Sequence, residues 1–233
     1  HCWGKVKESL QLIEEARARG VDITVDQYPY TATSTTLSAM LPAWAQEGGV
    51  EKLCARLSDP QERTRMRKDI EEKTDWENQV KACGTLDGIL VVYAPETPNI
   101  QGKTIGAAAR EMKTDALELA FDVIKANRGA ATACYFAMCE DDVEYVMRHR
   151  LVMVGSDSIP APPSAKPHPR TNGTFPRILG HYSRDKKVLA LEEAVRKMTS
   201  FPAARLKLAE KGQIAVGKDA DLVVFDPKTI KDC

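Results

Sequence analysis

The chain has 233 residues, of which 43% are hydrophobic and 28% charged, which is ordinary for a soluble globular protein of one large or two small domains. Its 33 Lys and Arg residues balance 33 Asp and Glu residues, so the formal net charge is zero. A neutral chain has no global field that would attract nucleic acid or an anionic membrane, and we therefore expect a small-molecule substrate or a protein partner.

The first third of the chain is expected to begin with a helix and a strand. Apolar residues recur at helical spacing over residues 6–19, and Gly20 stands where a helix end favours glycine. Residues 21–28 then alternate between apolar and polar, which indicates a strand. Helix, short loop and strand form the repeating unit of an α/β fold, in which side chains at the C-terminal end of a strand face the site. Here that end is the segment 28–30.

The middle of the chain is rich in expected helices. Residues 49–82 are highly charged and helix-prone, and a short apolar strand is expected over 88–93. Two further amphipathic helices are predicted over 105–112 and 117–126. We interpret about 45–120 as an insertion or lid on a barrel rather than as a separate domain.

The remaining elements alternate in type as well. A strand is expected over 131–138, a helix with an acidic first turn over 140–148, and a buried strand over 151–154. A proline-rich loop follows, and long loops of this kind are often functional. Residues 189–208 are expected to be helical around a break at Pro202.

The tail carries two short predicted strands between Gly212 and Asp226, turning around Gly217. Asp221 and Asp226 are interpreted as turn and edge residues rather than as catalytic ones. Physically, this pattern indicates only β-structure.

Asp157 is the first candidate for chemistry, because it follows an apolar strand and the flexible pair Gly155-Ser156. A carboxylate in that position can accept a proton or bind a metal, although capping of the next turn is an equally simple interpretation. Arg170 and Arg177 both follow prolines, and a planar guanidinium suits a substrate carboxylate. A structural ion pair would explain either arginine equally well.

Hydroxyl groups follow the first predicted strand. Tyr28, Tyr30 and Ser34 could orient a substrate carboxylate or carbonyl, and packing over the barrel mouth is the alternative. Packing is preferred for Tyr30, and the two interpretations are balanced for Tyr28.

Metal-binding motifs are not apparent in the histidines and cysteines. The six cysteines contain no CxxC pair, so reduced thiols in a cytoplasmic protein are expected. His1, His149 and His181 lack ligand spacing, and core or surface roles are expected for the last two. Local spacing therefore predicts no self-sufficient zinc site built from histidines.

The segments described so far resemble a known family. The tail GQIAVGKDADLVVFDP resembles the stretch by which amidohydrolase-superfamily chains return from the catalytic barrel to a small β-sandwich. Three more segments, WGK with DQYPYTATST, MVGSDS, and HPR with GTFPR and LALEEAVRKMTSFPAARL, resemble N-acyl-D-amino-acid deacylases (D-aminoacylases). The resemblance covers nearly the whole chain. It implies an α/β fold, with the C-terminal half of a (β/α)8 (TIM-like) barrel over 1–209 and part of the β-sandwich over 210–233.

The resemblance also implies a reaction and its residues. Members of this family hydrolyse the amide bond of N-acyl-D-amino acids with one or two zinc ions. Asp157 matches the family's general base, which activates the metal-bound water, protonates the leaving amine and is itself a metal ligand. Tyr28, Ser34 and Arg170 match positions that hold the α-carboxylate of the substrate.

Departures from the family pattern matter as much as the matches. The chain starts at His1 without Met, and the family's histidine ligands should lie upstream of Trp3, so we interpret the chain as a segment of a longer protein. Cys2 stands where the family is expected to have Asn. We expect the chain to keep one potential metal ligand, Asp157, not to hold zinc tightly, and to be inactive by itself. Its partner would be the missing N-terminal half or another copy of itself.

Two other functions stay open. An amidohydrolase acting on cyclic amides, as dihydroorotase does, fits the superfamily, but the YPY and HPR segments speak against it. A non-catalytic fragment that serves as a scaffold is supported by the missing ligands. For a deacylase, Gln27 and the segment 44–47 bring no arginine, which favours neutral or hydrophobic substrate side chains.

Overall fold

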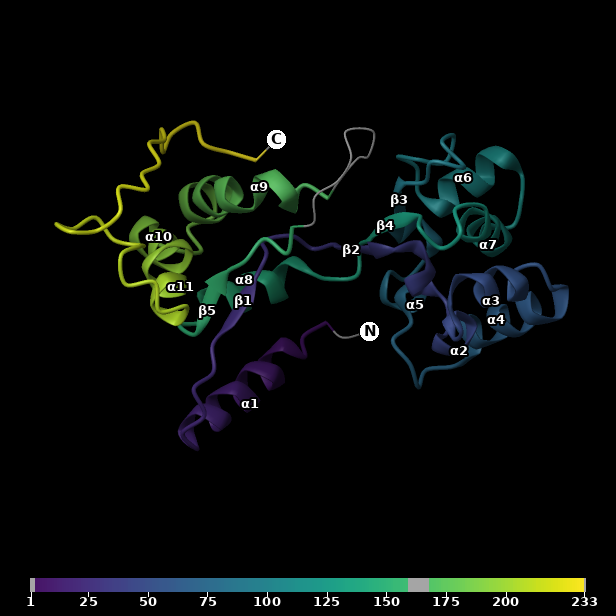
Figure 1. Ribbon diagram of the computed structural model, residues 1–233, viewed down its shortest axis with the longest axis horizontal. Coiled ribbons are helices and arrows are strands. Elements are labelled where there is room, and N and C mark those ends of the chain that lie inside the picture. Colours follow the sequence, from purple (N-terminus) through teal and green to yellow (C-terminus); the bar gives the residue numbers. More distant parts are fainter. Residues whose placement is uncertain (1–2, 159–167, 233) are drawn as a thin grey trace. The chain divides into compact units, whose positions relative to one another are not determined.

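The structure is a computed structural model that describes residues 3–158 and 168–232 and divides into two compact units (Figure 1). Unit 1 contains Thr31–Met138 and His168, and unit 2 contains the other described residues. The expectations for His1, for Cys2 and for most of the proline-rich loop concern residues outside the described ranges. No helix in these ranges is long and apolar enough to cross a bilayer.

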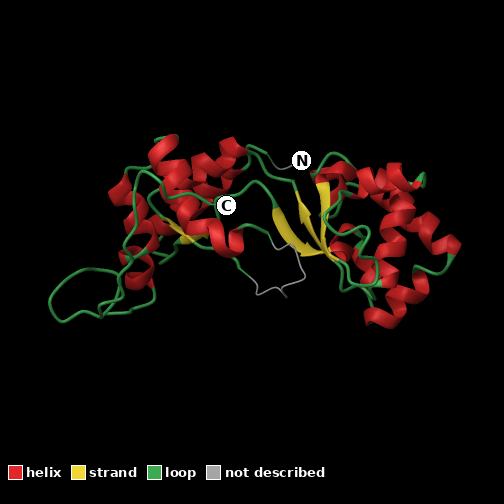
Figure 2. Cartoon of the chain, turned by 90° about the horizontal axis from the view of Figure 1, so that it is seen from above, coloured by secondary structure: helices red, strands yellow, loops and turns green. Residues whose placement is uncertain are grey.

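Unit 1 is built on a three-stranded antiparallel sheet in the order β2-β4-β3 (Figure 2). Its strands are β2 (Thr33–Thr36), β3 (Ile89–Tyr93) and β4 (Thr132–Tyr135). Thr33 and Ile89 both lie opposite Tyr135, and the pairing of β3 with β4 shifts register between Val91 and Tyr93. Its helices are η1 (Leu37–Met40), α2 (Ala43–Gln46), α3 (Gly49–Arg56), α4 (Pro60–Glu72), α5 (Gln79–Ala82), η2 (Leu86–Gly88), α6 (Ile105–Met112) and α7 (Ala116–Ala126).

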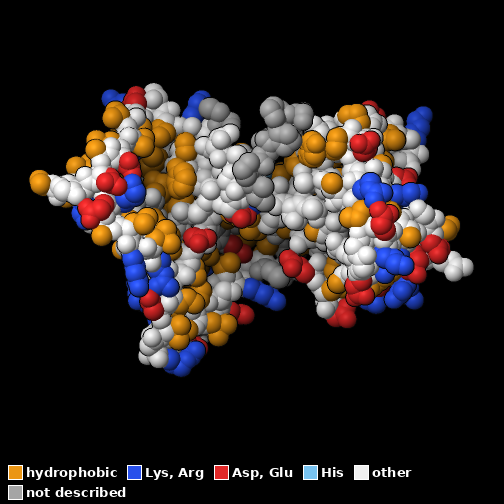
Figure 3. Space-filling model, in the orientation of Figure 1, with side chains coloured by type: hydrophobic (Ala, Val, Ile, Leu, Met, Phe, Trp, Pro, Cys, Tyr) orange, Lys and Arg blue, Asp and Glu red, His pale blue; other side chains and the backbone are white. Residues whose placement is uncertain are grey.

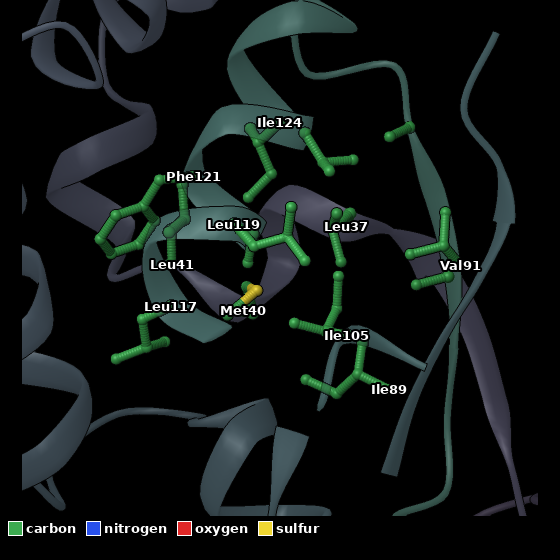
Figure 4. Packing of buried hydrophobic residues seen from close by; sticks show 14 of the residues in the cluster. Leu37, Met40, Leu41, Ile89, Val91, Ile105, Leu117, Leu119, Phe121 and Ile124 are labelled. Atoms are coloured by element: carbon green, nitrogen blue, oxygen red, sulfur yellow. The ribbon is translucent and has the colours of Figure 1, made fainter. Parts of the chain in front are cut away.

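Local signals explain where the longer helices of unit 1 begin. The side chain of Asp59 accepts a hydrogen bond from Gln61 N at 2.8 Å, and Pro60 occupies the first turn of α4, where its missing N–H costs nothing. Asp115 caps α7 in the same way and also pairs with Arg67 of α4 at 2.6 Å. Apolar side chains of η1, β3, α6 and α7 then point toward one another in a single core (Figure 4).

Unit 2 is built on two parallel strands, β1 (Val25–Gln27) and β5 (Val152–Val154), with Val25 opposite Val152 and Gln27 opposite Val154. Its helices are α1 (Val6–Ala18), α8 (Glu140–Arg148), α9 (Arg170–Arg177), the π-helix η3 (Ile178–Asp185), α10 (Leu191–Met198) and α11 (Ser200–Arg205). A second hydrophobic core joins α8, β5, η3 and α10 around the fully buried Tyr182.

A buried lysine fixes the outer side of β5. Gly155 N donates to Gln27 O at 3.1 Å, and Val25 N donates to Leu151 O at 3.0 Å. The main-chain groups of the odd-numbered residues along β5 therefore point toward β1. The carbonyl of Val152 points the other way and accepts from Lys197 Nζ of α10 at 2.8 Å. Lys197 is completely buried, and this burial lowers its pKa.

Several predicted elements are confirmed with small changes in length. The helices predicted over 6–19, 105–112, 117–126 and 140–148 all form within one residue of their expected bounds. The strand predicted over 21–28 is only three residues long, because residues before it are held by α1: Arg17 Nη1 donates to Ile23 O at 2.8 Å.

The break in the predicted helix 189–208 lies elsewhere than expected. Helix α10 ends at Met198, the next residue Thr199 has a φ of −130° and a ψ of −87° that are not helical, and α11 begins at Ser200. Pro202 therefore sits in the first turn of α11, where a missing N–H is tolerated. The prediction of a break at Pro202 is wrong for this reason.

The strands predicted between Gly212 and Asp226 do not form within the described part of the chain. Ile214 and Val224 are 91% and 98% exposed, and hydrophobic side chains reach the surface of unit 2 (Figure 3). A short apolar run becomes a strand only when another strand pairs with it and a core covers one face. Membership of a β-sandwich stays a prediction for these residues.

The barrel stays a prediction. The strands β1 and β5 are parallel, as barrel strands are, whereas β4, predicted over 131–138, pairs antiparallel with β2 and β3 in unit 1. The division at 209, and the interpretation of 45–120 as an insertion or lid, stay predictions.

Candidate active site

The candidate site lies where the two parallel strands of unit 2 end. Because β1 and β5 run in the same direction, their carboxyl ends meet at one edge. Tyr28 follows β1 directly, and Asp157 comes three residues after β5. Gly155 leaves room for the Asp26 side chain, since a Cβ at this position would lie 3.2 Å from Asp26 Oδ1.

Asp157 stands out in its backbone conformation. Its φ of +47° is in the left-handed region, which Asp tolerates better than most residues. The side chain is 64% exposed, and its Oδ2 accepts an ion-pair contact from Arg170 Nη2 at 2.9 Å. The carboxylate is thus open to solvent on one side and held by a guanidinium on the other.

Arg170 joins Asp157 to Tyr28. It is the first residue of α9 and its side chain is 4% exposed. Its Cζ lies 4.8 Å from the centroid of the Tyr28 ring, a cation–π contact. Unit 2 therefore brings together three of the four site residues that the sequence predicts.

Ser34, the fourth predicted residue, belongs to unit 1. It is half-buried on β2, opposite Cys134 of β4. His168 also lies in unit 1, where its Nε2 is 3.0 Å from Ala32 O. A role for Ser34 in binding stays a prediction.

Arg177 and Tyr30 have structural contacts. Arg177 Nε donates to Pro29 O at 2.8 Å, and its Nη1 pairs with Asp232 at 3.1 Å. Tyr30 is buried and its hydroxyl donates to Asp232 Oδ2 at 3.3 Å; burial, followed by the Asp232 charge, raises its pKa. The packing interpretation of Tyr30 agrees with these contacts.

Neither Asp232 nor the helix α9, which carries Arg170, is predicted from the sequence. An isolated Asp has no local signal, and Asp232 meets Tyr30 from 202 positions away. The sequence of α9 does not predict a helix, because it contains Gly173 and Pro176, which both disfavour helices. The wider π-helix η3 begins at Ile178, two residues after Pro176.

The described residues do not fit a complete metal centre. Across 3–158 and 168–232, no three His, Cys, Asp or Glu side chains come together as a metal site. His149 Nε2 instead lies 3.0 Å from Glu14, and His181 Nε2 lies 3.7 Å from Glu140. Asp157 offers one carboxylate, and any further ligands would come from outside these residues.

Comparisons with known proteins identify the family to which the chain belongs. The model of the family described as "Amidohydrolase family" matches residues 5–232. An N-acyl-D-glutamate deacylase of Alcaligenes xylosoxydans xylosoxydans is 35% identical over 230 residues, which are 99% of this chain and 37% of the relative. A D-aminoacylase of the same organism is 34% identical over the same coverage of both chains.

The solved structure of a related deacylase is also similar to this chain. The N-acyl-D-glutamate deacylase of Bordetella bronchiseptica, in complex with zinc and a phosphonate that mimics the tetrahedral intermediate, superposes with a TM-score of 0.71 at 31% identity. The match covers 99% of this chain and 39% of that one, so the chain spans little more than a third of the length of its relatives. The chain belongs to the amidohydrolase family, and its similarity to the N-acyl-D-amino-acid deacylases within that family is confirmed.

Proposed function

We propose that this chain works as part of a zinc-dependent deacylase that hydrolyses N-acyl-D-amino acids to a carboxylate and a free D-amino acid. The observation that carries the proposal is the convergence of Asp157, Arg170 and Tyr28 at one edge of the β1–β5 pair. The named activities of the relatives supply the reaction class. The wider architecture proposed with it is a barrel over 1–209, a lid over about 45–120 and a β-sandwich contribution from 210–233.

Arg170 would bind the α-carboxylate of the substrate. A planar guanidinium offers two parallel N–H donors to a carboxylate, and its burial strengthens that contact. The Tyr28 ring holds the guanidinium in place, and its hydroxyl would add a hydrogen bond to the same carboxylate. A substrate-binding role is proposed for Ser34 from the resemblance to the family alone. Fixing this group aims the scissile amide and sets the preference for the D enantiomer.

Asp157 would move the proton. When the substrate carboxylate takes the Arg170 guanidinium, the Asp157 carboxylate gives up its own partner and becomes available as a base. It would then accept a proton from the attacking water and deliver it to the nitrogen of the leaving amine. Zinc, when bound in the complete protein, supplies a more acidic water and a polarised acyl carbonyl.

The test is hydrolysis of N-acetyl-D-methionine and of its L enantiomer by the complete protein that contains this chain. We expect hydrolysis of the D enantiomer only. Equal rates for both enantiomers, or none for either, would refute the proposal. N-acetyl-D-glutamate, measured alongside, tests the preference for neutral side chains that Gln27 suggests.

A further inference from the structure

One face of α9 and η3 holds the end of the described chain. Gly173, Arg177, Gly180 and Arg184 follow one another at spacings of four, three and four residues, which places them along one side of a helix. A Cβ at Gly173 would overlap Tyr30 Oη and lie 2.9 Å from Asp232 Cβ, and one at Gly180 would overlap the carbonyl of Ile230. The two glycines therefore let residues 230–232 lie directly against the helix.

The two arginines hold this segment at different points. Arg184 Nη1 donates to the carbonyls of Lys228 and Ile230 at 3.2 and 2.7 Å. Arg177 instead reaches a side chain, Asp232, at 3.1 Å. Both arginines hold the same segment, and Arg177 also contacts Pro29, the residue after Tyr28.

Arg177 connects this segment to the turn that carries Tyr28. Its Nε donates to Pro29 O at 2.8 Å, and its Cζ lies 4.9 Å from the centroid of the Tyr30 ring. Proline has no N–H, so its carbonyl is the main-chain group of Pro29 through which the turn can be held. Tyr28, the next residue back, packs its ring against Arg170.

We propose that Arg177, oriented by Asp232, is a positioning residue that fixes the backbone at Pro29 and thereby the face that Tyr28 presents to Arg170. The inference rests on the proposed function, because it assigns Arg177 to the binding of the substrate α-carboxylate. Arg177 acts through Pro29 and Tyr28, with no contact to the substrate of its own. Lysine cannot replace it, because a single ammonium lacks the planar fork that serves Pro29 O and Asp232 together.

The test uses two substrates and a matched control in the complete protein. Arg177→Lys is compared with Arg184→Lys, which alters the same helix face and the same chain segment one heptad away. The substrates are N-acetyl-D-methionine and N-acetyl-D-methioninamide, which lacks the α-carboxylate. We expect Arg177→Lys to lower kcat/KM for the acid roughly 10- to 100-fold, mainly through KM, and to leave the amide nearly unchanged. Arg184→Lys should leave the ratio between the two substrates as it is in the wild type.

Each outcome bears on the proposal. Equal losses on both substrates would show that Arg177 only stabilises the fold, and unchanged kinetics would show that it does not act on the site. Either result overturns the inference, whereas the proposed function still stands if the wild type is active. If the wild type hydrolyses neither substrate, the proposed function and the inference both fall. Should Arg177→Lys not fold, Asp232→Asn keeps the side-chain volume, removes the charge that faces Arg177, and should give the same acid-specific loss on a smaller scale.

Discussion

Replacing the buried Lys197 with methionine tests how β5, the strand that leads to Asp157, is held. Methionine has nearly the same length, so the change removes the ammonium with little change in volume. His149 O keeps a hydrogen bond from Val152 N at 3.2 Å, whereas Val152 O loses the Lys197 donor at 2.8 Å. One buried acceptor left without a donor costs about 1–3 kcal/mol, and we expect unit 2 to lose about 2 kcal/mol of its free energy of unfolding.

Amide hydrogen exchange over residues 152–155 measures this loss in unit 2 without assuming that both units unfold together. A loss of about 2 kcal/mol corresponds to exchange roughly 30-fold faster at pH 7. Lys228→Met, an exposed lysine of the same unit, is the control and should leave the rate unchanged. Exchange as slow as in the wild type, or slower, would contradict the reasoning, because removing a buried charge would then offset the lost hydrogen bonds.

Comparison of the wild type with Lys197→Met also tests how the free energy of unfolding depends on pH. Burial lowers the pKa of Lys197 below its usual 10.5, so the unfolded chain binds more protons than the folded one between the two values. The stability of the wild type therefore rises with pH in that window, while Lys197→Met lacks this contribution. The advantage of the wild type over the variant should grow from neutral pH toward pH 10; a constant difference would contradict the linkage.

Two further predictions concern other contacts. In unit 1, Tyr135 is buried and its hydroxyl donates to Thr36 O at 2.9 Å. Tyr135→Phe should therefore lower the free energy of unfolding by about 1–2 kcal/mol. A urea denaturation curve that matches the wild type would contradict this prediction. In unit 2, the hydrogen bond from Lys186 holds the pKa of Glu144 below its usual 4.5. The resulting stabilisation is present above pH 4.5 and is lost as the pH falls through the pKa of Glu144 in the folded protein. Glu144→Gln should therefore flatten the acid side of the stability profile, and an unchanged profile would show that this pair contributes nothing there.

Helices and strand ends of this chain could be predicted from sequence because their signals are local. Helix periodicity gave α1, α6, α7 and α8 within one residue, and the apolar strand before Gly155 gave the position of Asp157. A structural ion pair was one of two predicted roles for Arg170, but its partner, Asp157, follows only from the structure.

What the sequence could not show depends on contacts between distant residues. Helix α9 forms although it contains Gly173 and Pro176, and the close approach of Asp232 explains why glycine is there. The tail between Gly212 and Asp226 has the glycines of a hairpin and the apolar run of a strand, but pairing requires a partner strand that local sequence cannot supply. Contacts with distant residues decide both cases: α9 has them, and the tail has no partner strand within the described residues.

The most direct test of the central claim, that Asp157 is the proton-transfer group, is Asp157→Asn in the complete protein with N-acetyl-D-methionine. Asp185→Asn is the matched control, because it also removes an exposed carboxylate that pairs with an arginine in unit 2. The pair of Asp185 with Arg184 is exposed and contributes little to stability, whereas Arg170 is buried. The kcat values are therefore compared at a temperature at which thermal unfolding shows both variants to be folded. We expect kcat to fall about 10²- to 10⁴-fold for Asp157→Asn alone. A kcat for Asp157→Asn close to that of Asp185→Asn would contradict the assignment.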